Sequence, residues 1–351
     1  MSRQLIAVGI VAALLQSPAP AAVAQDATPS DGVAVTQIAV VTPASRTNQG
    51  WDQQAADAAE AVAAELGIEA TVAENVGYED PTPVLRDLAA GGASVIICHA
   101  SGYQTVCPEF AAESGVPVVV VENPAATSPG LVADIETQAQ EAAYLAGVLA
   151  GNTTSGGTVG VIVSGEPPTW NFMTVGFAEG LKAANPDARL LYGVIGEAAY
   201  DDAAGAKRVA EQQIAAGADV IFGMGDGASF GMLQAVEEHN AVADDAVRFI
   251  DVIGDKRTDH GDALLTSVLF DYTDIYRQMV ADLEAGTFGS VYTMDLQNGG
   301  VRLLDLPDEV PAEARASVAA AEREIVEGRL AVSAVGDADG VRQRLDELFP
   351  G

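Results

Sequence analysis

Short apolar runs rich in β-branched residues alternate with alanine-rich stretches of helical periodicity along most of the chain, from Thr36 onward. This alternation is typical of parallel βαβ units. A first series predicts strands at 36–42, 69–74, 93–98 and 116–122, with helices at 51–66, 81–91 and 105–114 between them. A second series predicts strands at 158–164, 188–195, 218–223 and 247–253, with helices at 170–185, 201–216 and 228–240.

The two series resemble each other in sequence. LAAGGASVIICHASG (88–102) aligns with IAAGADVIFGMGDG (214–227) after one gap, and each contains a helix end, a buried strand and a glycine-containing loop. The only two tryptophans, Trp51 and Trp170, each lie at the start of the helix that follows the first strand of a series. An internal repeat of this kind predicts an α/β protein with two similar lobes, each a parallel sheet flanked by helices.

The segments outside the two series suggest that the chain passes between the lobes several times. We expect lobe 1 at 35–135, a crossover helix at 137–150 and lobe 2 at 156–256. Hinge crossovers and strands returning to the lobes are expected at 257–305, and a C-terminal helical segment at 306–351. The hinge region includes an apolar run at 264–270, a helix near 272–285 and a strand pair around 291–304. The stretch PAEARASVAAAEREIVEGRLAV predicts a closing helix packed on one lobe.

The N-terminus has the pattern of a secretory signal peptide. Arg3 precedes an apolar run at 5–15, and Ala22-Val23-Ala24 forms a small-residue cleavage site. We expect residues 1–24 to be removed and residues 25–34 to be a disordered mature N-terminus, whereas a retained membrane anchor is the alternative. No cysteine for lipid attachment follows the apolar run, so a soluble periplasmic or secreted protein is expected.

The formal net charge of −33 makes the protein strongly acidic, with 50 Asp and Glu against 17 Lys and Arg. Such a surface repels nucleic acid and anionic membranes. The acidic residues are spread along the chain, which favours solvation over a specific basic partner.

In two facing α/β lobes, ligands bind beyond the carboxyl ends of the strands. Trp51 and Trp170 would then offer an aromatic face on each wall of a cleft, suited to a purine or pyranose ring, unless each only packs its helix on its sheet. Asp226, in a Gly-Asp-Gly turn, could accept hydrogen bonds from a ligand or could cap the next helix. Asn48, Glu166 and Tyr103 are further candidates in strand-end loops.

Other chemical motifs are weak. GMGDGA (223–228) follows the third strand of its series rather than the first, so it is a poor dinucleotide-binding motif. His99, His239 and His260 lack metal-ligand spacing, although His99 beside Cys98 is the best metal candidate. We therefore expect no metal, no cofactor and no catalytic residues. Cys98 and Cys107, the only cysteines, are expected to form a disulfide because the chain is exported.

Several runs, in order, resemble the basic membrane protein family of substrate-binding proteins: TNQGWDQQAADAAEAVAAELG, LRDLAAGGASVIICHASGYQ, EAAYLAGVLAG, GFAEGLKAANPDARLL, AAGADVIFGMGDGAS, LLTSVLFDYTDIY and EIVEGRLAV. The resemblance extends from about Val35 to Val332. It implies a two-lobed type I periplasmic-binding fold, a monomer that works with the membrane permease of an ABC importer, and a purine nucleoside or nucleobase as ligand.

The resemblance also implies positions for ligand contacts. The family's first loop corresponds to Asn48 and the stacking residue Trp51, its second to Ser101, Gly102 and Tyr103, and its polar turn to Asp226. Two departures are visible. Phe270 and Asp271 stand where nucleoside-binding members usually have a lysine, and IGDKRTD replaces the family's G-V-D-x-D type turn, so Asp255 is only an approximate match.

The expected function is that of a solute-binding protein rather than an enzyme. A sugar receptor, a sensory binding protein and, with less support, a nucleoside-cleaving enzyme remain alternatives. A free base is as compatible with the departures as a nucleoside is.

Overall fold

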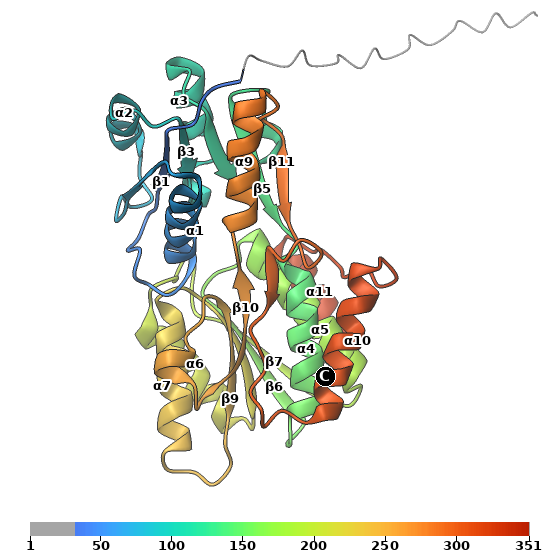
Figure 1. Cartoon of the computed structure of the whole chain (residues 1–351). Helices are drawn as coiled ribbons and strands as arrows, with labels where there is room; N and C mark the ends of the chain where they lie inside the picture. The colour runs from blue at the N-terminus through green and yellow to red at the C-terminus, as the bar shows by residue number, and fades with distance from the viewer. Residues whose placement is uncertain (1–31, 351) are drawn as a thin grey trace, which may run out of the picture.

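The computed structural model describes residues 32–350, in two lobes that each contain a six-stranded sheet (Figure 1). The strands of the first sheet, in the order β11-β5-β4-β3-β1-β2, are β1 (Gln37–Val41), β2 (Glu69–Ala73), β3 (Val95–Cys98), β4 (Val118–Val121), β5 (Val132–Thr137) and β11 (Val291–Met294). Those of the second, in the order β12-β10-β9-β8-β6-β7, are β6 (Thr158–Val163), β7 (Arg189–Val194), β8 (Val220–Met224), β9 (Arg248–Ile253), β10 (Leu264–Phe270) and β12 (Val301–Leu303).

Helices flank both sheets, as the alternating pattern predicts. With the first sheet lie α1 (Trp51–Leu66), α2 (Thr82–Ala90), α3 (Val106–Ser114) and α9 (Thr273–Ala285). With the second lie α4 (Ala139–Thr153), α5 (Pro168–Ala184), α6 (Ala203–Ala215), α7 (Ala228–Asn240), α8 (Arg257–His260), α10 (Ala312–Val326) and α11 (Ala338–Leu348). The two predicted α/β series are confirmed, and the helix predicted at 51–66 has those bounds.

The described chain crosses between the lobes three times: between β5 and β6, between β10 and β11, and between β11 and β12. The predicted strand pair around 291–304 is wrong in its pairing. β11 lies parallel to β5 in the first sheet, whereas β12 lies antiparallel to β10 in the second. The two short strands cannot pair with each other because each completes the edge of a different sheet.

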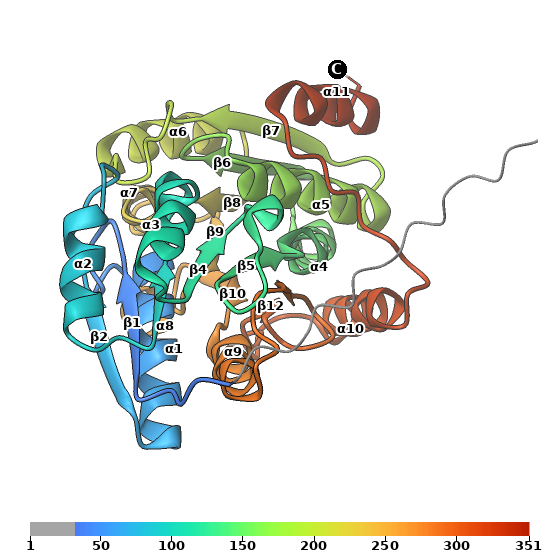
Figure 2. The same ribbon diagram turned by 90° about the horizontal axis from the view of Figure 1, so that it is seen from above.

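The C-terminal segment is helical, as the sequence predicts: α10 forms in the stretch predicted as a closing helix, and α11 follows it. α10 packs against α4 and α11 packs against α5, so both cover the second lobe (Figure 2). Two ion pairs fasten α11, from Arg342 to Glu166 at 2.7 Å and from Arg344 to Glu179 at 2.8 Å. α11 is short and strongly charged, and it buries Val341 and Leu345 on the face that meets α5.

The predicted signal peptide at 1–24 and most of the predicted disordered segment at 25–34 lie outside the described residues. Within residues 32–350, no helix has the length and apolar character needed to cross a membrane.

The packing of α4 against α5 forms the centre of the second lobe. Three glycines, Gly147 on α4 and Gly176 and Gly180 on α5, face the backbone of the opposite helix. A Cβ atom on Gly180 would collide with the Tyr144 carbonyl oxygen, and one on Gly147 would collide with that of Phe177. The two helix backbones can approach this closely only because these positions lack side chains.

We expect Gly180→Ala to lower the free energy of unfolding by about 1–3 kcal/mol, the usual cost of overpacking, despite the better helix propensity of alanine. Urea denaturation measures the change. Gly196→Ala is the matched control, because a Cβ there meets only Ala199 Cβ at 3.5 Å. Equal stabilities of the two variants would contradict the packing argument.

Candidate functional site

A cleft lies between the lobes, where the carboxyl ends of strands from both sheets face each other. Its cavity volume is about 60 Å³. Its lining combines four aromatic rings, two carboxylates and small or cyclic residues: Trp51, Tyr78, Trp170, Tyr200, Glu122, Asp226, Pro43, Ala100, Ser101, Pro167 and Thr169. Four of the sequence-predicted site residues come together in this lining, namely Trp51, Ser101, Trp170 and Asp226.

Trp51 is the first residue of α1, and its ring packs against His99, the residue that follows β3. The two rings stack with centroids 4.5 Å apart. His99 Nε2 donates to the Trp51 carbonyl oxygen at 3.0 Å, and Trp51 Nε1 donates to the His99 carbonyl oxygen at 3.4 Å. Burial lowers the pKa of His99 to about 3, so this imidazole stays neutral and acts as a rigid support for Trp51.

Trp170 lies in the first turn of α5, on the other wall of the cleft. It is 5 % exposed, and its Nε1 donates to Ser164 Oγ at 3.3 Å. The structure thus places the two tryptophans in one cleft, one from each lobe, as their equivalent positions in the repeat predict.

Two tyrosines complete the aromatic lining and were not predicted from the sequence. Tyr78 follows β2 and Tyr200 follows β7, so they occupy equivalent positions in the two lobes. Their ring centroids lie 6.5 Å apart, which brings the lobes into contact at the cleft. The internal repeat could have predicted this pair, because each tyrosine comes after the second strand of its series.

Asp226 and Glu122 are the carboxylates of the lining, one from each lobe. Asp226 Oδ1 accepts a hydrogen bond from the Trp51 backbone N–H at 3.1 Å, and Glu122 Oε1 accepts one from the Thr169 hydroxyl. Both bonds cross the cleft, so the lobes are closed on each other. Burial raises the pKa of Asp226 to about 7, to which the nearby carboxylate of Asp52 contributes, and burial also raises the pKa of Glu122.

Asn48 does not line the cleft but organises the loop that enters α1. Its Oδ1 accepts from the Gly50 backbone N–H at 3.0 Å, and its Nδ2 donates to Asp52 Oδ2 at 2.7 Å. Asp52 is 1 % exposed, and burial raises its pKa. Asn48 and Asp52 thereby hold the backbone that presents Trp51.

Tyr103 and Gly102 lie beside the cleft without lining it. Tyr103 is completely buried in the core of the first lobe, and its hydroxyl donates to the Gly77 carbonyl oxygen. Gly102 faces the Tyr78 carbonyl oxygen. Of the predicted Ser-Gly-Tyr loop, only Ser101 therefore reaches the cleft, because the loop turns as a short 3₁₀ helix at Ser101–Tyr103.

Three other predicted site residues also lie outside the lining. Glu166 pairs with Arg342 of α11, and Asp255 pairs with Arg257 at 2.7 Å. Phe270, at the end of β10, is 1 % exposed and lies edge-on to Trp51 with ring centroids 6.2 Å apart. It supports the tryptophan from the second lobe, while Glu166 and Asp255 have structural partners.

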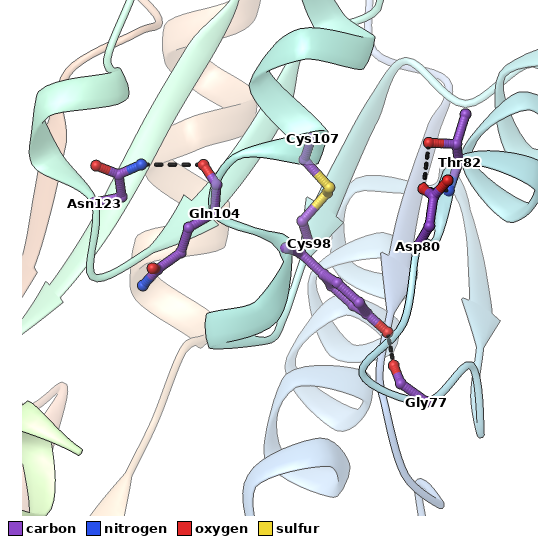
Figure 3. The surroundings of a disulfide bond; sticks show 8 residues. Gly77, Asp80, Thr82, Cys98, Gln104, Cys107 and Asn123 are labelled. Carbon is purple, nitrogen blue, oxygen red and sulfur yellow. Dashed lines mark hydrogen bonds between the residues drawn. A yellow bond between two sulfur atoms is a disulfide. The ribbon is translucent and has the colours of Figure 1, made fainter.

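The predicted disulfide between Cys98 and Cys107 is confirmed (Figure 3). It joins the last residue of β3 to the first turn of α3, and the loop that it closes contains His99 and Ser101. Both cysteines are completely buried. The bridge thus fixes a loop that contributes both the support of Trp51 and a residue of the lining.

The groups that line the cleft are suited to binding a ring-shaped molecule. Aromatic faces, two carboxylates and a few small polar groups can stack on a ring and accept hydrogen bonds. Among the described residues, no group of three or more His, Cys, Asp or Glu side chains could hold a metal ion.

Comparison with known protein families identifies the family of this chain. The family described as Bmp, ABC transporter substrate-binding protein PnrA-like, matches residues 35–335. The chain belongs to the Bmp family. The resemblance to the basic membrane protein family is thereby confirmed, together with the two-lobed type I periplasmic-binding fold.

Similar proteins of known sequence or structure agree with Bmp-family membership. The chain is 27% identical over 206 residues to the ABC transporter nucleoside-binding protein BmpA of Lactococcus lactis, a match that covers 55% of this chain and 57% of that relative's length. A solute-binding protein of Conexibacter woesei has a TM-score of 0.72 at 23% identity, covering 86% of this chain and 100% of the other. One from Aeropyrum pernix has a TM-score of 0.76 at 20% identity, covering 89% and 97%.

Removal of the disulfide from this Bmp-family protein is expected to lower the free energy of unfolding by about 2–3 kcal/mol, the chain-entropy value for a loop of this length. The variant is Cys98→Ala with Cys107→Ala, compared with the wild type by urea denaturation. Wild type reduced in denaturant and refolded with its thiols blocked is the second comparison. Unchanged stability in both would contradict the proposed stabilisation.

The raised pKa of Asp226 makes stability depend on pH. The folded state keeps a proton on Asp226 up to about pH 7, whereas an unfolded Asp releases it near ~4. The contribution of this group to stability therefore falls as pH rises through that window. We expect Asp226→Asn to escape this loss, so that its stability relative to wild type rises between about pH 4 and pH 7. A pH-independent difference in urea titrations would refute the assignment.

Proposed function

We propose that the protein is the extracytoplasmic solute-binding component of an ABC importer and that it holds a purine nucleobase or nucleoside between its lobes. Membership of a family of ABC transporter substrate-binding proteins supports the transport role. The name of the Lactococcus lactis relative, a nucleoside-binding protein, supports the ligand class. The partner would be the permease in the membrane, to which the closed lobes present a joint surface.

One observation carries the ligand proposal: the only two tryptophans of the chain, Trp51 and Trp170, line the same cleft from opposite lobes. A flat ring between them would bury both of its faces against aromatic side chains. Tyr78 and Tyr200 add two further rings at the contact between the lobes. In a chain with only 5% aromatic residues, this concentration of rings favours a ring-shaped ligand.

The test is a binding panel of adenosine, guanosine, inosine, the free purine bases and common pyranose and furanose sugars, using the chain from Gln25 onward. Because both tryptophans line the cleft, intrinsic tryptophan fluorescence reports directly on occupation. A ligand at 100 times its Kd should also stabilise the fold by ~2.7 kcal/mol, visible as a thermal shift. Binding of sugars but not of purines would refute the ligand class, and release of free base from a nucleoside over many turnovers would refute the receptor role.

Substitution of Trp51 separates stacking from other contacts. We expect Trp51→Ala to weaken purine binding by the ~1–3 kcal/mol typical of base–aromatic stacking, which is about 5- to 150-fold in Kd, and Trp51→Phe to retain most of the affinity. Tyr276→Phe is the control, since this buried tyrosine lies outside the lining and its hydroxyl has no hydrogen-bond partner within the described residues. Isothermal titration calorimetry measures all three. Equal affinities of wild type and Trp51→Ala would contradict stacking on this residue.

A further inference from the structure

The charged residues that line the cleft indicate which sign of charge a ligand would have. Of the described residues that line the cleft, two are acidic, Glu122 and Asp226, and none is Lys, Arg or His. Neither carboxylate forms an ion pair with any basic side chain of residues 32–350. A binding site that encloses carboxylates without a counter-ion disfavours anionic ligands and gains free energy from a ligand that supplies positive charge.

Each carboxylate also keeps one oxygen for a ligand. The hydrogen bonds given to them by the described part of the chain reach only Asp226 Oδ1, from the Trp51 N–H, and Glu122 Oε1, from the Thr169 hydroxyl. Asp226 Oδ2 and Glu122 Oε2 therefore retain their accepting capacity. Since the two residues come from different lobes, a donor or cation between them would contact both walls of the closed cleft.

The basic and titratable groups near the cleft do not neutralise these carboxylates. Lys256 acts on Asp226, but its effect on the pKa is smaller than the opposing effects of burial and of Asp52. The Lys256 ammonium is fully buried in an ion pair with Asp251, so its positive charge is already balanced by the Asp251 carboxylate. His99, behind Trp51, stays neutral because burial lowers its pKa to about 3.

Aromatic faces add a second source of attraction for a cation. A positive charge within about 6 Å of a Trp or Tyr ring is stabilised by the ring quadrupole, and more strongly when the charge is desolvated. Trp51, Tyr78, Trp170 and Tyr200 all line the cleft. Four rings together with two unpaired carboxylates form a site in which the same charge meets favourable partners on several sides.

We propose that the cleft selects a flat, ring-shaped organic cation, with Asp226 and Glu122 as its counter-ions and the surrounding rings as its apolar walls. This inference rests on the proposed function in placing the ligand between Trp51 and Trp170, and it adds a sign of charge to the ligand class. The formal net charge of −33 on the whole chain would additionally attract such a ligand from solution.

Two matched pairs of ligands test the charge. 1-Methyladenosine is a cation near neutral pH, and 1-methylinosine is its neutral counterpart with the same ribose and methyl group. 1-Methylnicotinamide is a permanent cation, and nicotinamide is neutral. Calorimetry at about pH 8, where Asp226 is ionised because its pKa is about 7, should give the cation of a pair at least about tenfold tighter binding.

Variants then locate the effect. The double variant Asp226→Asn with Glu122→Gln keeps an oxygen acceptor for the Trp51 N–H and one for the Thr169 hydroxyl but removes both negative charges. The cation and the neutral ligand of each pair should therefore bind with nearly equal Kd. Asp245→Asn is the control: its side chain is 91% exposed in the loop before β9, at the end of the strand opposite the cleft. It should keep the full preference.

The outcomes separate the two proposals. Equal or weaker binding of the cations, with clear binding of 1-methylinosine, would overturn the charge inference and leave a nucleoside receptor. Binding of 1-methylnicotinamide without any nucleoside would support the charge inference and refute the nucleoside proposal. A preference that survives loss of both carboxylates would also overturn the inference, and absence of binding by every ligand of both pairs would count against both proposals.

Discussion

The contact between the loop at 48–50 and the second lobe sets the geometry of the cleft. A Cβ on Gly50 would crowd Asp226 Oδ1, and one on Gly254 would collide with the Gln49 carbonyl oxygen, so two glycines allow the lobes to meet here. The meeting places the Trp51 backbone N–H on the Asp226 carboxylate. Position and electrostatics are therefore linked, because the bond that closes the lobes also holds the partly buried Asp226 carboxylate beside the aromatic wall.

The lobes and their elements could be predicted from the sequence because they follow from periodicity that is repeated twice. The spacing of Trp51 and Trp170 within the repeat was enough to predict that they face one cleft. Parallel sheets bring the carboxyl ends of their strands to one edge, so position relative to the strand determines location. The same argument, applied to Tyr78 and Tyr200, would have found the second aromatic pair.

The direction of individual loop side chains could not be predicted in this way. Tyr103 and Ser101 are two residues apart, yet the turn between them sends one into the core and the other to the cleft. Glu166 is paired with Arg342, which lies 176 residues later in the C-terminal helical segment. Such partners depend on tertiary packing and leave no mark on local periodicity.

The three chain crossings between the lobes determine which relative motions remain. A single flexible tether would let two lobes tumble independently, and closure on a ligand would then cost much orientational entropy. Three chain segments connect the lobes, from β5 to β6, from β10 to β11 and from β11 to β12. Together they hold the lobes in one mutual orientation and leave mainly a rotation about the line of the crossings. Closure of the lobes on a ligand therefore costs little orientational entropy. A small molecule with few contacts can consequently still hold both lobes together.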